Sequence, residues 1–267
     1  MSIAEGDWVV AIVEGKNRRK VYAFRLRAKA SYSTFAGSFR GEQAIGLPWG
    51  SRIELERGVA YLLRPTLYDL LNLVLPRRSQ VIYPKDAGFM LAALGLRPGM
   101  RVLEAGVGSG FMTIWAAVHV CPGGQVYGYD VRRDMIELAS RNVEAAGFAD
   151  CVKIKEGDVR AGVEEADLDA AILDMPDPWD ALGPLWRSLR PSSPVGVFVP
   201  TANQVSKLLA ALGPMGGYVV QEVAEVFKRE WEPRAEALRP STRMVGHTGF
   251  VVILRRTAQE PAAQARP

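Results

Sequence analysis

A strand that runs directly into three closely spaced glycines is the strongest chemical signal in this sequence. The segment Val102–Gly110 reads VLEAGVGSG, with Glu104 ahead of Gly106, Gly108 and Gly110. Glycines let the backbone approach a ligand closely and adopt positive φ. The dinucleotide fingerprint has the wider spacing GxGxxG, which places a pyrophosphate at the N-terminus of the following helix. The tighter spacing here favours a ligand with an amino-acid end, whose ammonium group can meet acid or carbonyl oxygens. A purely structural turn is the alternative.

Two further acids follow the next two strands of the same region. Asp130 ends the strand-like segment 125–130, about twenty residues after the last loop glycine, where an acid can accept hydrogen bonds from both hydroxyls of a ribose. Asp158 follows the segment 152–155 and can accept a hydrogen bond from the amino group of an adenine. The alternatives are a helix-capping or turn acid for Asp130 and a surface-loop acid for Asp158. With the glycine loop, the two acids favour a nucleoside that carries an amino-acid end.

An acid and two prolines follow the fourth strand-like segment, 170–173, where residues 174–179 read DMPDPW. Ligands of open α/β sheets gather at the carboxyl ends of the strands, which places Asp174 beside the reacting group of the ligand. The prolines stiffen the loop and remove backbone donors, and Trp179 offers a stacking face for a planar base. The loop is similar to the (D/N)PP(aromatic) loop of adenine amino methyltransferases, and a rigid turn is the alternative interpretation.

These residues need a scaffold of alternating helices and strands, and the sequence has that pattern from Asp86 to Leu254. Helical apolar spacing alternates with short strand-like runs, which predicts a mostly parallel sheet with helices on both faces. The predicted helices include 86–94, 111–120 and 135–146, and the predicted strands are 101–105, 125–130, 152–155, 170–173, 195–199, 219–227 and 249–254.

A smaller β domain is predicted ahead of this scaffold. Strand-like runs at 8–13, 21–26, 52–55 and 60–63 are separated by turn residues, and Thr66 can cap a helix that extends through Leu75. We therefore predict three regions: a small β domain over 1–64, a larger α/β domain over 65–256, and a disordered tail, rich in Ala, Gln and Pro, over 257–267.

The small domain carries a basic stretch without acids between Gly15 and Arg40. Cations and aromatic residues are interleaved there, which suits RNA phosphates and unstacked bases. A solvated hairpin with outward basic positions is the alternative. The cations are Lys16, Arg18, Arg19, Lys20, Arg25, Arg27, Lys29 and Arg40, and the aromatic residues are Tyr22, Phe24, Tyr32, Phe35 and Phe39.

Composition argues against several other classes of protein. Hydrophobic residues make up 48% and charged residues 23% of the 267 residues, as in ordinary globular domains. The apolar runs are too short to span a membrane, and the start of the chain lacks the pattern of a secretion signal, so we expect a cytoplasmic protein. Cys121 and Cys151 are interpreted first as two buried thiols, with a disulfide between them or between subunits as the alternative. With only His119 and His247 as histidines, we expect no metal site.

Three separated motifs are similar to those of the tRNA adenine-N1 methyltransferase family, which acts on the T-loop adenine at tRNA position 58. Residues 77–86, RRSQVIYPKD, resemble the family's RxxQxxYPKD segment, which precedes the cofactor loop and closes over the cofactor. DMPDPW at 174–179 resembles the catalytic loop of the family. Arg239-Pro240, Arg243-Met244 and GHTGF at 246–250 resemble its C-terminal signature.

This resemblance implies a Rossmann-like, seven-stranded class I methyltransferase sheet of the α/β class, with a small N-terminal β domain, a homotetrameric assembly and S-adenosyl-L-methionine as the cofactor. It implies methyl transfer to N1 of adenine 58 of tRNA, with adenine 57 as a further target in archaeal relatives, and Asp174 as the catalytic residue. The cofactor-binding residues are then Gln80, Glu104, Gly106, Val107, Gly108, Ser109, Gly110, Asp130, Asp158 and Asp174. The substrate-binding residues are Tyr83, Trp179, Arg77, Arg78, Arg243 and His247, of which Trp179 or Tyr83 would stack on the target base.

Three other functions are compatible with parts of this pattern. A class I methyltransferase acting on a small molecule or a protein would keep the cofactor site but would have no use for the basic N-terminal face. A non-catalytic tRNA-binding subunit, as found among eukaryotic members of the family, would not need the glycine loop, Asp130 and Asp174 together. A dinucleotide oxidoreductase is disfavoured by the GxGxG spacing.

Overall fold

The chain divides into two compact units, which are described separately. A computed structural model describes residues 1–16, 18–233 and 235–262. The first unit is Met1–Pro76, and the second begins at Arg77. The sequence placed the boundary at residue 64 instead. The two positions differ by a short helical segment, whose turn η2 (Leu70–Val74) contacts strand β2 (Arg18–Arg25) of the first unit.

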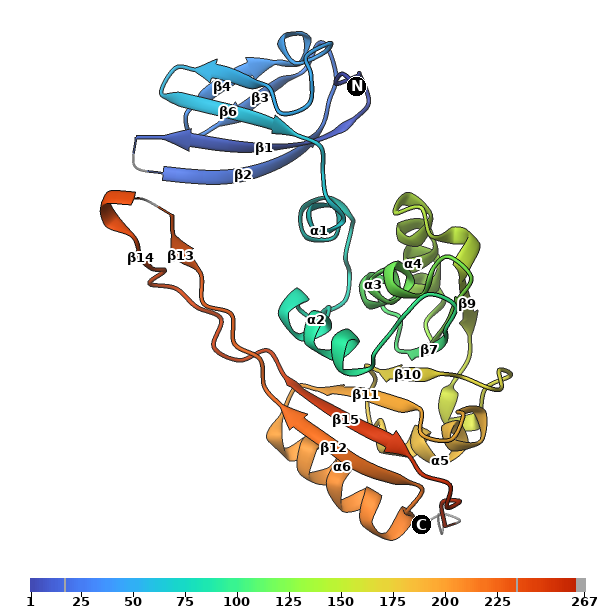
Figure 1. Ribbon diagram of the computed structural model, residues 1–267. Helices are drawn as coiled ribbons and strands as arrows, with labels where there is room; N and C mark the ends of the chain where they lie inside the picture. The colour runs from blue at the N-terminus through green and yellow to red at the C-terminus, as the bar shows by residue number, and fades with distance from the viewer. Residues whose placement is uncertain (17, 234, 263–267) are drawn as a thin grey trace. The chain divides into compact units, whose positions relative to one another are not determined.

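An antiparallel sheet in the order β2-β1-β6-β5 forms the centre of the first unit (Figure 1). β1 is a central strand, which pairs with β2 along its whole length and with β6 on its other side. The four predicted strands are confirmed, while the hairpin of β3 and β4 is an addition that the sequence did not predict. The remaining elements of the unit are β1 (Trp8–Gly15), β3 (Ser31–Thr34), β4 (Gly37–Arg40), η1 (Gly41–Gln43), β5 (Arg52–Leu55), β6 (Gly58–Leu63) and, after its cap Thr66, α1 (Leu67–Asp69).

The aromatic residues of the basic stretch pack in or against the core of the first unit. The rings of Phe24 and Tyr32 stack with centroids 4.2 Å apart, and Phe39, only 3% exposed, packs against both. The Tyr32 hydroxyl also donates to the Arg25 carbonyl at 2.8 Å. The other four rings are half-buried and pack against this core, so the rings stabilise the unit, and their use as stacking partners for bases stays a prediction. The cations of the stretch, by contrast, are exposed: Lys16, Arg18, Arg19, Lys20, Arg25, Arg27, Lys29 and Arg40.

A seven-stranded sheet in the order β12-β15-β11-β10-β7-β8-β9 forms the second unit (Figure 1). Its first five strands in sequence are mutually parallel, and β15 runs antiparallel to both β11 and β12. This confirms the α/β class and the seven-stranded sheet. The strands are β7 (Arg101–Ala105), β8 (Gln125–Asp130), β9 (Val152–Glu156), β10 (Ala170–Leu173), β11 (Pro194–Val199), β12 (Tyr218–Ala224) and β15 (Phe250–Arg256); the helices are α2 (Pro84–Ala93), α3 (Phe111–Val120), α4 (Arg133–Ala145), α5 (Trp179–Ser188) and α6 (Ala202–Met215), with short 3-10 turns η3 (Ala149–Cys151) and η4 (Val159–Ala161).

Successive residues of the central strands enter two separate cores, because side chains alternate between the two faces of a sheet. Leu103 and Leu173 pack into the core that contains α5 and α6. Their neighbours Val102 and Ile172 pack into the core that contains α2 and α3. Helices therefore cover both faces, as predicted. The parallel strands β7 to β11 end at a common edge, and the loops that follow them meet there.

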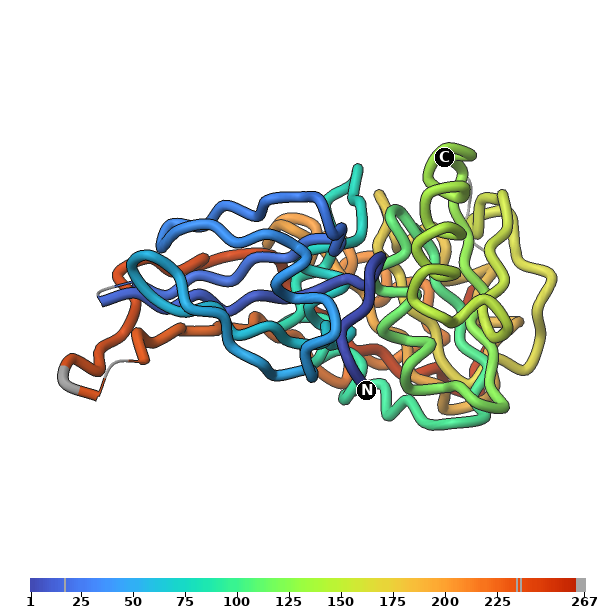
Figure 2. Tube along the Cα trace, turned by 90° about the horizontal axis from the view of Figure 1, so that it is seen from above, coloured from blue at the N-terminus to red at the C-terminus, as the bar shows by residue number. Residues whose placement is uncertain are grey.

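Between β12 and β15 the chain leaves the sheet as a two-stranded arm (Figures 1 and 2). β13 (Trp231–Glu232) pairs with β14 (Arg239–Pro240) in this arm, and η5 (Ala235–Ala237) lies between them. The predicted strand 219–227 is shorter in the structure, because β12 ends at Ala224 and the following residues begin the arm. No helix in the described ranges is long and apolar enough to cross a membrane.

The first part of the predicted disordered tail packs onto the second unit. The backbone N–H of Thr257 donates to the Gly217 carbonyl at 2.9 Å, and that of Ala262 donates to the Met215 carbonyl at 2.8 Å. These bonds hold residues 257–262 against the end of α6, which the composition of the tail did not indicate. Positions 263–267 of that prediction lie outside the described residues.

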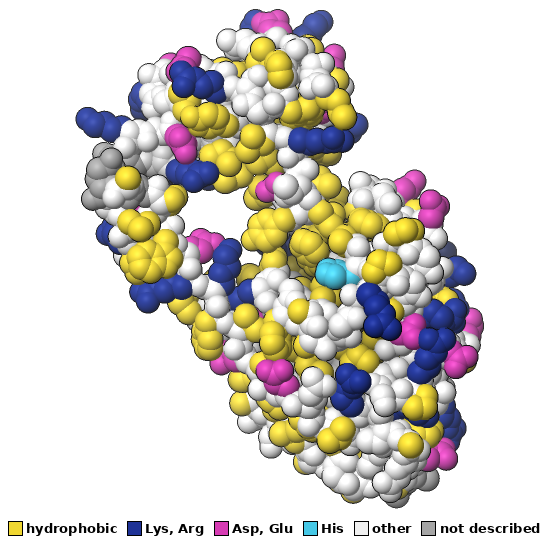
Figure 3. Space-filling model, in the orientation of Figure 1, with side chains coloured by type: hydrophobic (Ala, Val, Ile, Leu, Met, Phe, Trp, Pro, Cys, Tyr) yellow, Lys and Arg dark blue, Asp and Glu magenta, His cyan; other side chains and the backbone are white. Residues whose placement is uncertain are grey.

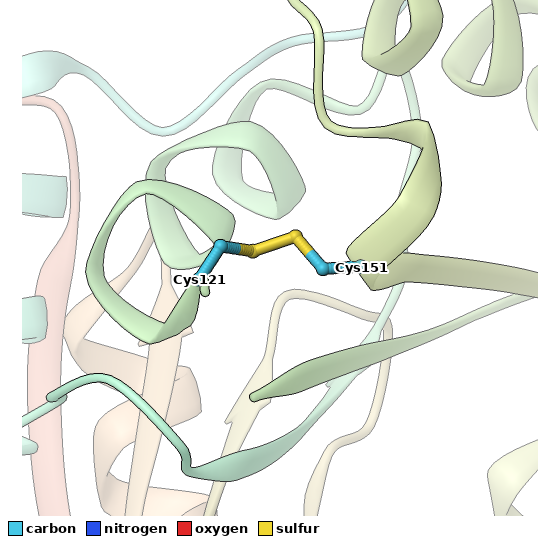
Figure 4. The surroundings of a disulfide bond; sticks show 2 residues. All are labelled: Cys121 and Cys151. Atoms are coloured by element: carbon cyan, nitrogen blue, oxygen red, sulfur yellow. A yellow bond between two sulfur atoms is a disulfide. The ribbon is translucent and has the colours of Figure 1, made fainter. Parts of the chain in front are cut away.

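Cys121 and Cys151 form a disulfide between the end of α3 and the start of β9 (Figure 4). Their Cα atoms are 6.4 Å apart, across a sequence separation of 30 residues. The first interpretation, two buried thiols, is therefore wrong, and the alternative of a bond between these two cysteines holds. Sequence spacing could not decide between the two, because the packing of α3 beside the sheet sets the distance between the cysteines.

Candidate functional site

A cavity of about 500 Å³ opens at the carboxyl ends of the parallel strands of the second unit. Its wall joins segments that are far apart in the sequence: 79–82, 104–109, 111–112, 129–132, 157–160 and 174–176. Of the predicted cofactor residues, Gln80, Glu104, Gly106, Val107, Gly108, Ser109, Asp130, Asp158 and Asp174 line it. Gly110 does not line the cavity; it is the N-cap of α3, with φ +81°.

The glycines of the loop are required by close backbone contacts as well as by their conformations. Gly106 has φ +87°, and a Cβ there would lie 1.9 Å from the carbonyl oxygen of Asp174. Gly108 has φ +54°, and a Cβ there would lie 2.8 Å from the Ser79 Oγ. Both positions therefore exclude a side chain, and the first one sets how closely the glycine loop approaches the Asp174 loop.

Hydrogen bonds of Ser79 and Ser109 hold the segment before α2 against the glycine loop. The Ser109 backbone N–H donates to the Ser79 Oγ at 3.1 Å, and the two hydroxyls lie 2.9 Å apart. The backbone N–H of Arg78 donates to the Ser109 Oγ at 3.1 Å. These bonds place Gln80 in the wall of the cavity. Sequence reasoning did not identify Ser79, although it lies inside the RRSQ motif.

Asp130 uses both carboxylate oxygens to shape the loop around it. Its Oδ2 accepts from the Gly108 N–H at 2.9 Å, and its Oδ1 accepts from the Arg132 N–H at 2.9 Å. The Arg132 Nε lies 3.6 Å from the same Oδ1. These bonds fix the side chain at the end of β8 and leave lone pairs for further donors.

Asp158 is held by Arg160, which also lines the cavity. The guanidinium donates to both carboxylate oxygens of Asp158, at 2.9 Å from Nε and 2.7 Å from a terminal nitrogen. The Arg160 backbone N–H adds a third bond, at 3.0 Å, which caps η4. The guanidinium hydrogen bonds lower the pKa of the Asp158 carboxyl, so the side chain is a fixed acceptor.

Glu104 stands in the opposite situation, because no donor of the described residues lies within hydrogen-bond distance of its carboxylate oxygens; Thr113 on α3 is the neighbouring donor. The residue is 1% exposed and both of its carboxylate oxygens lack a hydrogen-bond partner. Its cross-strand neighbours are Ile172 on β10 and Gly128 on β8, neither of which offers a side-chain donor. Burial raises the pKa of Glu104 to about 8. The neighbouring Thr113 hydroxyl lowers this pKa, and repulsion from Asp174 and Asp130 adds to the rise.

Asp174 follows β10 and lines the cavity beside the glycine loop. Its backbone N–H donates to the Ala105 carbonyl at 2.9 Å, which extends the β7–β10 pairing into the loop. Burial raises the pKa of the Asp174 carboxyl to about 7. A carboxyl group that titrates near neutral pH is matched to proton transfer at that pH.

The predicted base-stacking residues occupy different environments. Trp179 does not line the cavity: it packs against the core with α5 and α6, and the Lys207 Nζ lies 5.9 Å from its ring centroid. Tyr83 caps the N-terminus of α2, directly after the cavity-lining segment 79–82, and is 38% exposed. Of the two aromatic residues, Tyr83 is therefore the one available to a base.

The predicted tRNA-binding cations are exposed, whereas His247 is engaged within the protein. Arg77, Arg78 and Arg243 have exposed side chains. The Nδ1 of His247 lies 2.5 Å from a Glu225 carboxylate oxygen, and the Nε2 lies 2.7 Å from the Pro200 carbonyl. Since both partners are acceptors, the pair favours a doubly protonated ring, and the Glu225 hydrogen bond raises the pKa of His247.

A buried ion pair behind the cavity wall was not singled out from the sequence, although its residues end the YPKD motif. Asp86 is fully buried, and Lys85 donates to it at 2.8 Å. Lys85 also donates to the Val226 carbonyl and the Thr248 hydroxyl, at 2.6 and 2.5 Å. The pair thereby ties the start of α2 to both ends of the β12–β15 arm.

The residues around the cavity fit S-adenosyl-L-methionine better than a dinucleotide. Glu104 is a buried carboxylate without a donor within hydrogen-bond distance among the described residues, and Asp130 and Asp174 share its cavity. Such a wall suits a ligand with ammonium and sulfonium charges and repels a pyrophosphate. The described residues contain no group of three His, Cys, Asp or Glu side chains arranged to hold a metal ion.

Comparison with known proteins points to a single family. The family model of the tRNA methyltransferase complex GCD14 subunit matches residues 58–248. A tRNA (adenine(58)-N(1))-methyltransferase of Thermus thermophilus is 40% identical over 194 residues, which are 72% of this chain and 75% of that protein. A tRNA (adenine(57)-N(1)/adenine(58)-N(1))-methyltransferase of Methanocaldococcus jannaschii is 32% identical over 221 residues, 73% of this chain and 78% of that protein. The crystal structure of a tRNA (m1A58) methyltransferase from Aquifex aeolicus has a TM-score of 0.87 at 30% identity and covers 97% of this chain and 100% of its own.

Proposed function

The chain belongs to the family of the tRNA methyltransferase complex GCD14 subunit, and from that membership we propose that it transfers a methyl group from S-adenosyl-L-methionine to N1 of adenine 58 in tRNA. One observation carries the proposal. The glycine loop and Asp174, which are far apart in the sequence, meet in one cavity whose carboxylates suit a cationic cofactor.

When bound, S-adenosyl-L-methionine supplies an electrophilic methyl group on its sulfonium. The chain's contribution is to hold and orient that cofactor. Gln80 and the loop from Gly106 to Ser109 would line its amino-acid end, and Asp130 would accept from its ribose hydroxyls. Asp158, fixed by Arg160, would accept from its adenine amino group, because the arginine leaves this carboxylate ionised.

Asp174 is the proposed catalytic residue. Its carboxylate would accept a hydrogen bond from the N6 amino group of the target adenine and so aim N1 at the methyl group. Methylation at N1 makes the adenine cationic, and a neighbouring carboxylate stabilises that charge and can take the N6 proton. Because burial raises its pKa to about 7, the group can both hold and release a proton near neutral pH.

The target adenine must leave the folded T-loop to present its Watson–Crick edge, as bases do in other nucleic-acid-modifying enzymes. We assign the stacking partner of the extruded base to Tyr83, since Trp179 packs against the core and does not line the cavity. A flat ring beside the cavity holds a base of any type by its face. The choice of adenine would therefore rest on Asp174.

The test is methyl transfer to transcripts that differ in single bases. Unmodified tRNA with adenine at positions 57 and 58 is incubated with methyl-labelled cofactor and the modified nucleoside is mapped. We expect 1-methyladenosine at position 58 and its loss when that base is guanosine; a parallel transcript lacking adenine 57 tests the second target. Labelling that persists in the position-58 variant, or that appears only on proteins or metabolites, would reject the proposal.

The exposed cations of the first unit are proposed to contact the tRNA backbone (Figure 3). Each phosphate contact releases counterions, so binding should weaken with salt. The triple substitution of Arg18, Arg19 and Lys20 on β2 to Ala should reduce the slope of log K against log salt by up to about three. An unchanged slope would show that β2 does not contact the tRNA backbone.

We further propose that the chain assembles as a homotetramer, and that it works on tRNA in the cytoplasm. Large apolar side chains are exposed along the edge strand β12 and the arm (Figure 3), and exposed patches of this kind mark protein interfaces. They include Val219, Val220, Val223, Phe227, Trp231, Leu238, Met244 and Val245. Light scattering should give about four times the chain mass of 29.2 kDa, and charge substitutions at Trp231 and Leu238 should lower it.

A further inference from the structure

The side chain of Glu104 is a buried acid whose carboxyl oxygens have no hydrogen-bond partner within bonding distance among the described residues. Its carboxylate is buried in the wall of the cavity. Thr113 on α3, which packs on the same face of the sheet, is the neighbouring donor: its interaction with Glu104 lowers the pKa of that carboxyl but does not offset the effect of burial, and its Oγ1 has no partner within hydrogen-bond distance. A buried charge without a donor is strongly disfavoured, so the free protein holds this carboxyl in its neutral, protonated form.

The charged groups around Glu104 add to this preference. Asp174 at the end of β10 and Asp130 at the end of β8 are both acids and both repel a charge on Glu104. The two cations of the cavity wall are paired elsewhere, Arg132 with Asp130 and Arg160 with Asp158. Behind the wall, the three protons of Lys85 point to Asp86, Val226 and Thr248. A compensating cation for Glu104 must therefore come with the ligand.

We propose that Glu104 is the charge-sensing residue of the site, which gives up its proton to the solvent when the ammonium group of the cofactor enters the cavity. This inference rests on the proposed function, because it takes the cofactor to be S-adenosyl-L-methionine. The O–H bond of the carboxylic acid breaks, the proton passes to the buffer, and the resulting carboxylate faces the ligand's ammonium, which remains protonated. No other bond forms or breaks.

The position of Glu104 selects the ammonium group as its partner. The residue lies two positions before Gly106, at the start of the loop whose spacing favours an amino-acid end. Asp130 and Asp158 are the proposed acceptors for the ribose and the adenine, and Asp174 lies where the reacting methyl group is expected. Glu104 is thus the acid left for the ammonium, and an opposite charge within ~4–6 Å favours the ionised form of a carboxyl.

Calorimetry measures the proton directly. Binding enthalpies of the full-length protein are compared at pH 6.5 in two buffers of different ionisation enthalpy, which gives the number of protons released per ligand. The ligands are S-adenosylmethionine, S-adenosylhomocysteine, which has the ammonium but no sulfonium charge, and 5′-methylthioadenosine, which has neither. The variants are Glu104→Gln, which mimics the protonated side chain and should fold, and Asp174→Asn, which removes the other acid that titrates near neutral pH.

With S-adenosylmethionine and with S-adenosylhomocysteine, we expect wild type to release about one more proton than Glu104→Gln. With 5′-methylthioadenosine, we expect wild type and Glu104→Gln to release the same number of protons. Asp174→Asn should still release about one proton. The association constant of S-adenosylhomocysteine should rise about tenfold from pH 6 to pH 7 in the wild type, because one bound proton is displaced, and less steeply in Glu104→Gln.

Several results would overturn the inference. Equal proton release by wild type and Glu104→Gln would assign the proton to another group, and release with S-adenosylmethionine alone would assign the effect to the sulfonium. Release with 5′-methylthioadenosine equal to that with S-adenosylhomocysteine would exclude the ammonium as the cause. In each of these cases the cofactor still binds and the proposed function stands, whereas failure of all three ligands to bind would count against the proposed function itself.

Discussion

On the β8–β9 side of the cavity, the carboxylates of Asp130 and Asp158 accept hydrogen bonds from backbone N–H groups, and Asp158 also accepts from the guanidinium of Arg160. On the β7–β10 side, Glu104 has no donor within hydrogen-bond distance in the described part of the chain, and burial raises the pKa of Glu104 to about 8 and that of Asp174 to about 7. Both sides of the cavity carry the same chemical group, the carboxyl group of Asp or Glu. Donors stabilise the ionised form on one side, and burial favours the neutral form on the other.

The cavity therefore combines acids fixed by hydrogen-bond donors with acids that titrate near neutral pH. A carboxylate that is already ionised and held in place can accept hydrogen bonds from a nucleoside without further change. A carboxyl group that is neutral in the free protein responds to the charge of whatever binds beside it. Each of the following changes tests one side of the cavity against the other.

The largest effect is expected at Asp174. The substitution Asp174→Asn keeps the shape but removes the acid–base group, so kcat should fall by ~10²–10⁴-fold while S-adenosylhomocysteine still binds. The measurement is single-turnover methyl transfer to unmodified tRNA, with binding by calorimetry. Asp177→Asn in the same loop is the matched control, because Asp177 is exposed, does not line the cavity, and has a φ of +52° that Asn tolerates. Equal rates for the two variants would remove Asp174 from the chemistry.

The next largest effect is expected at Gly106, where the glycine loop after β7 contacts the Asp174 loop after β10. A methyl group there meets the Asp174 carbonyl at 1.9 Å, so Gly106→Ala should lower cofactor affinity at least about tenfold and destabilise the fold by ~1–3 kcal/mol. Gly183→Ala in α5 is the control: nothing lies within 4 Å of its Cβ, and it should be neutral or stabilising by ~0.5–1 kcal/mol. Calorimetry and thermal unfolding measure both, and an unaffected Gly106→Ala would mean that the loop contact is dispensable.

A moderate effect is expected on the pH dependence of stability. The pKa of Glu104 is about 8 in the folded protein against 4.5 unfolded, so the folded state binds more protons and its stability falls as pH rises through this window. Without ligand, Tm should fall more steeply between pH 6 and pH 8 in the wild type than in Glu104→Gln, by about 2–4 °C per pH unit. Parallel Tm curves would place the titrating group elsewhere.

The smallest effect is expected on the β8–β9 side, where the acids already accept hydrogen bonds from the protein. Arg160→Met removes the donors that fix Asp158, which should weaken cofactor binding by about fivefold. Stability should hardly change, because the ion pair is more than a third exposed. Arg133→Met is the control, since Arg133 pairs with Glu137 on α4 and does not line the cavity. Identical cofactor affinities for the two variants would show that Asp158 binds the cofactor equally well without Arg160.

Local patterns in the sequence predicted much of the framework. Helix α3 begins and ends at the predicted residues, Phe111 and Val120, because a glycine cap precedes it and Cys121-Pro122 follows it. The central strands were predicted nearly as well, since short apolar runs bounded by Gly and Asp carry a strong local signal. The β3–β4 hairpin and the arm were missed, because their exposed or half-polar residues lack such periodicity.

Local features of the chain, namely the glycine spacing and the acids at strand ends, were enough to identify the residues that could do chemistry. The burial and hydrogen bonding of each side chain became visible in the folded structure. The fold buries Glu104 between Ile172 and Gly128, places Arg160 beside Asp158, packs Trp179 against the core and joins Cys121 to Cys151. The physical reason is that solvation and hydrogen-bond donors come from segments far away along the chain, and a residue's own neighbours in the sequence do not reveal them.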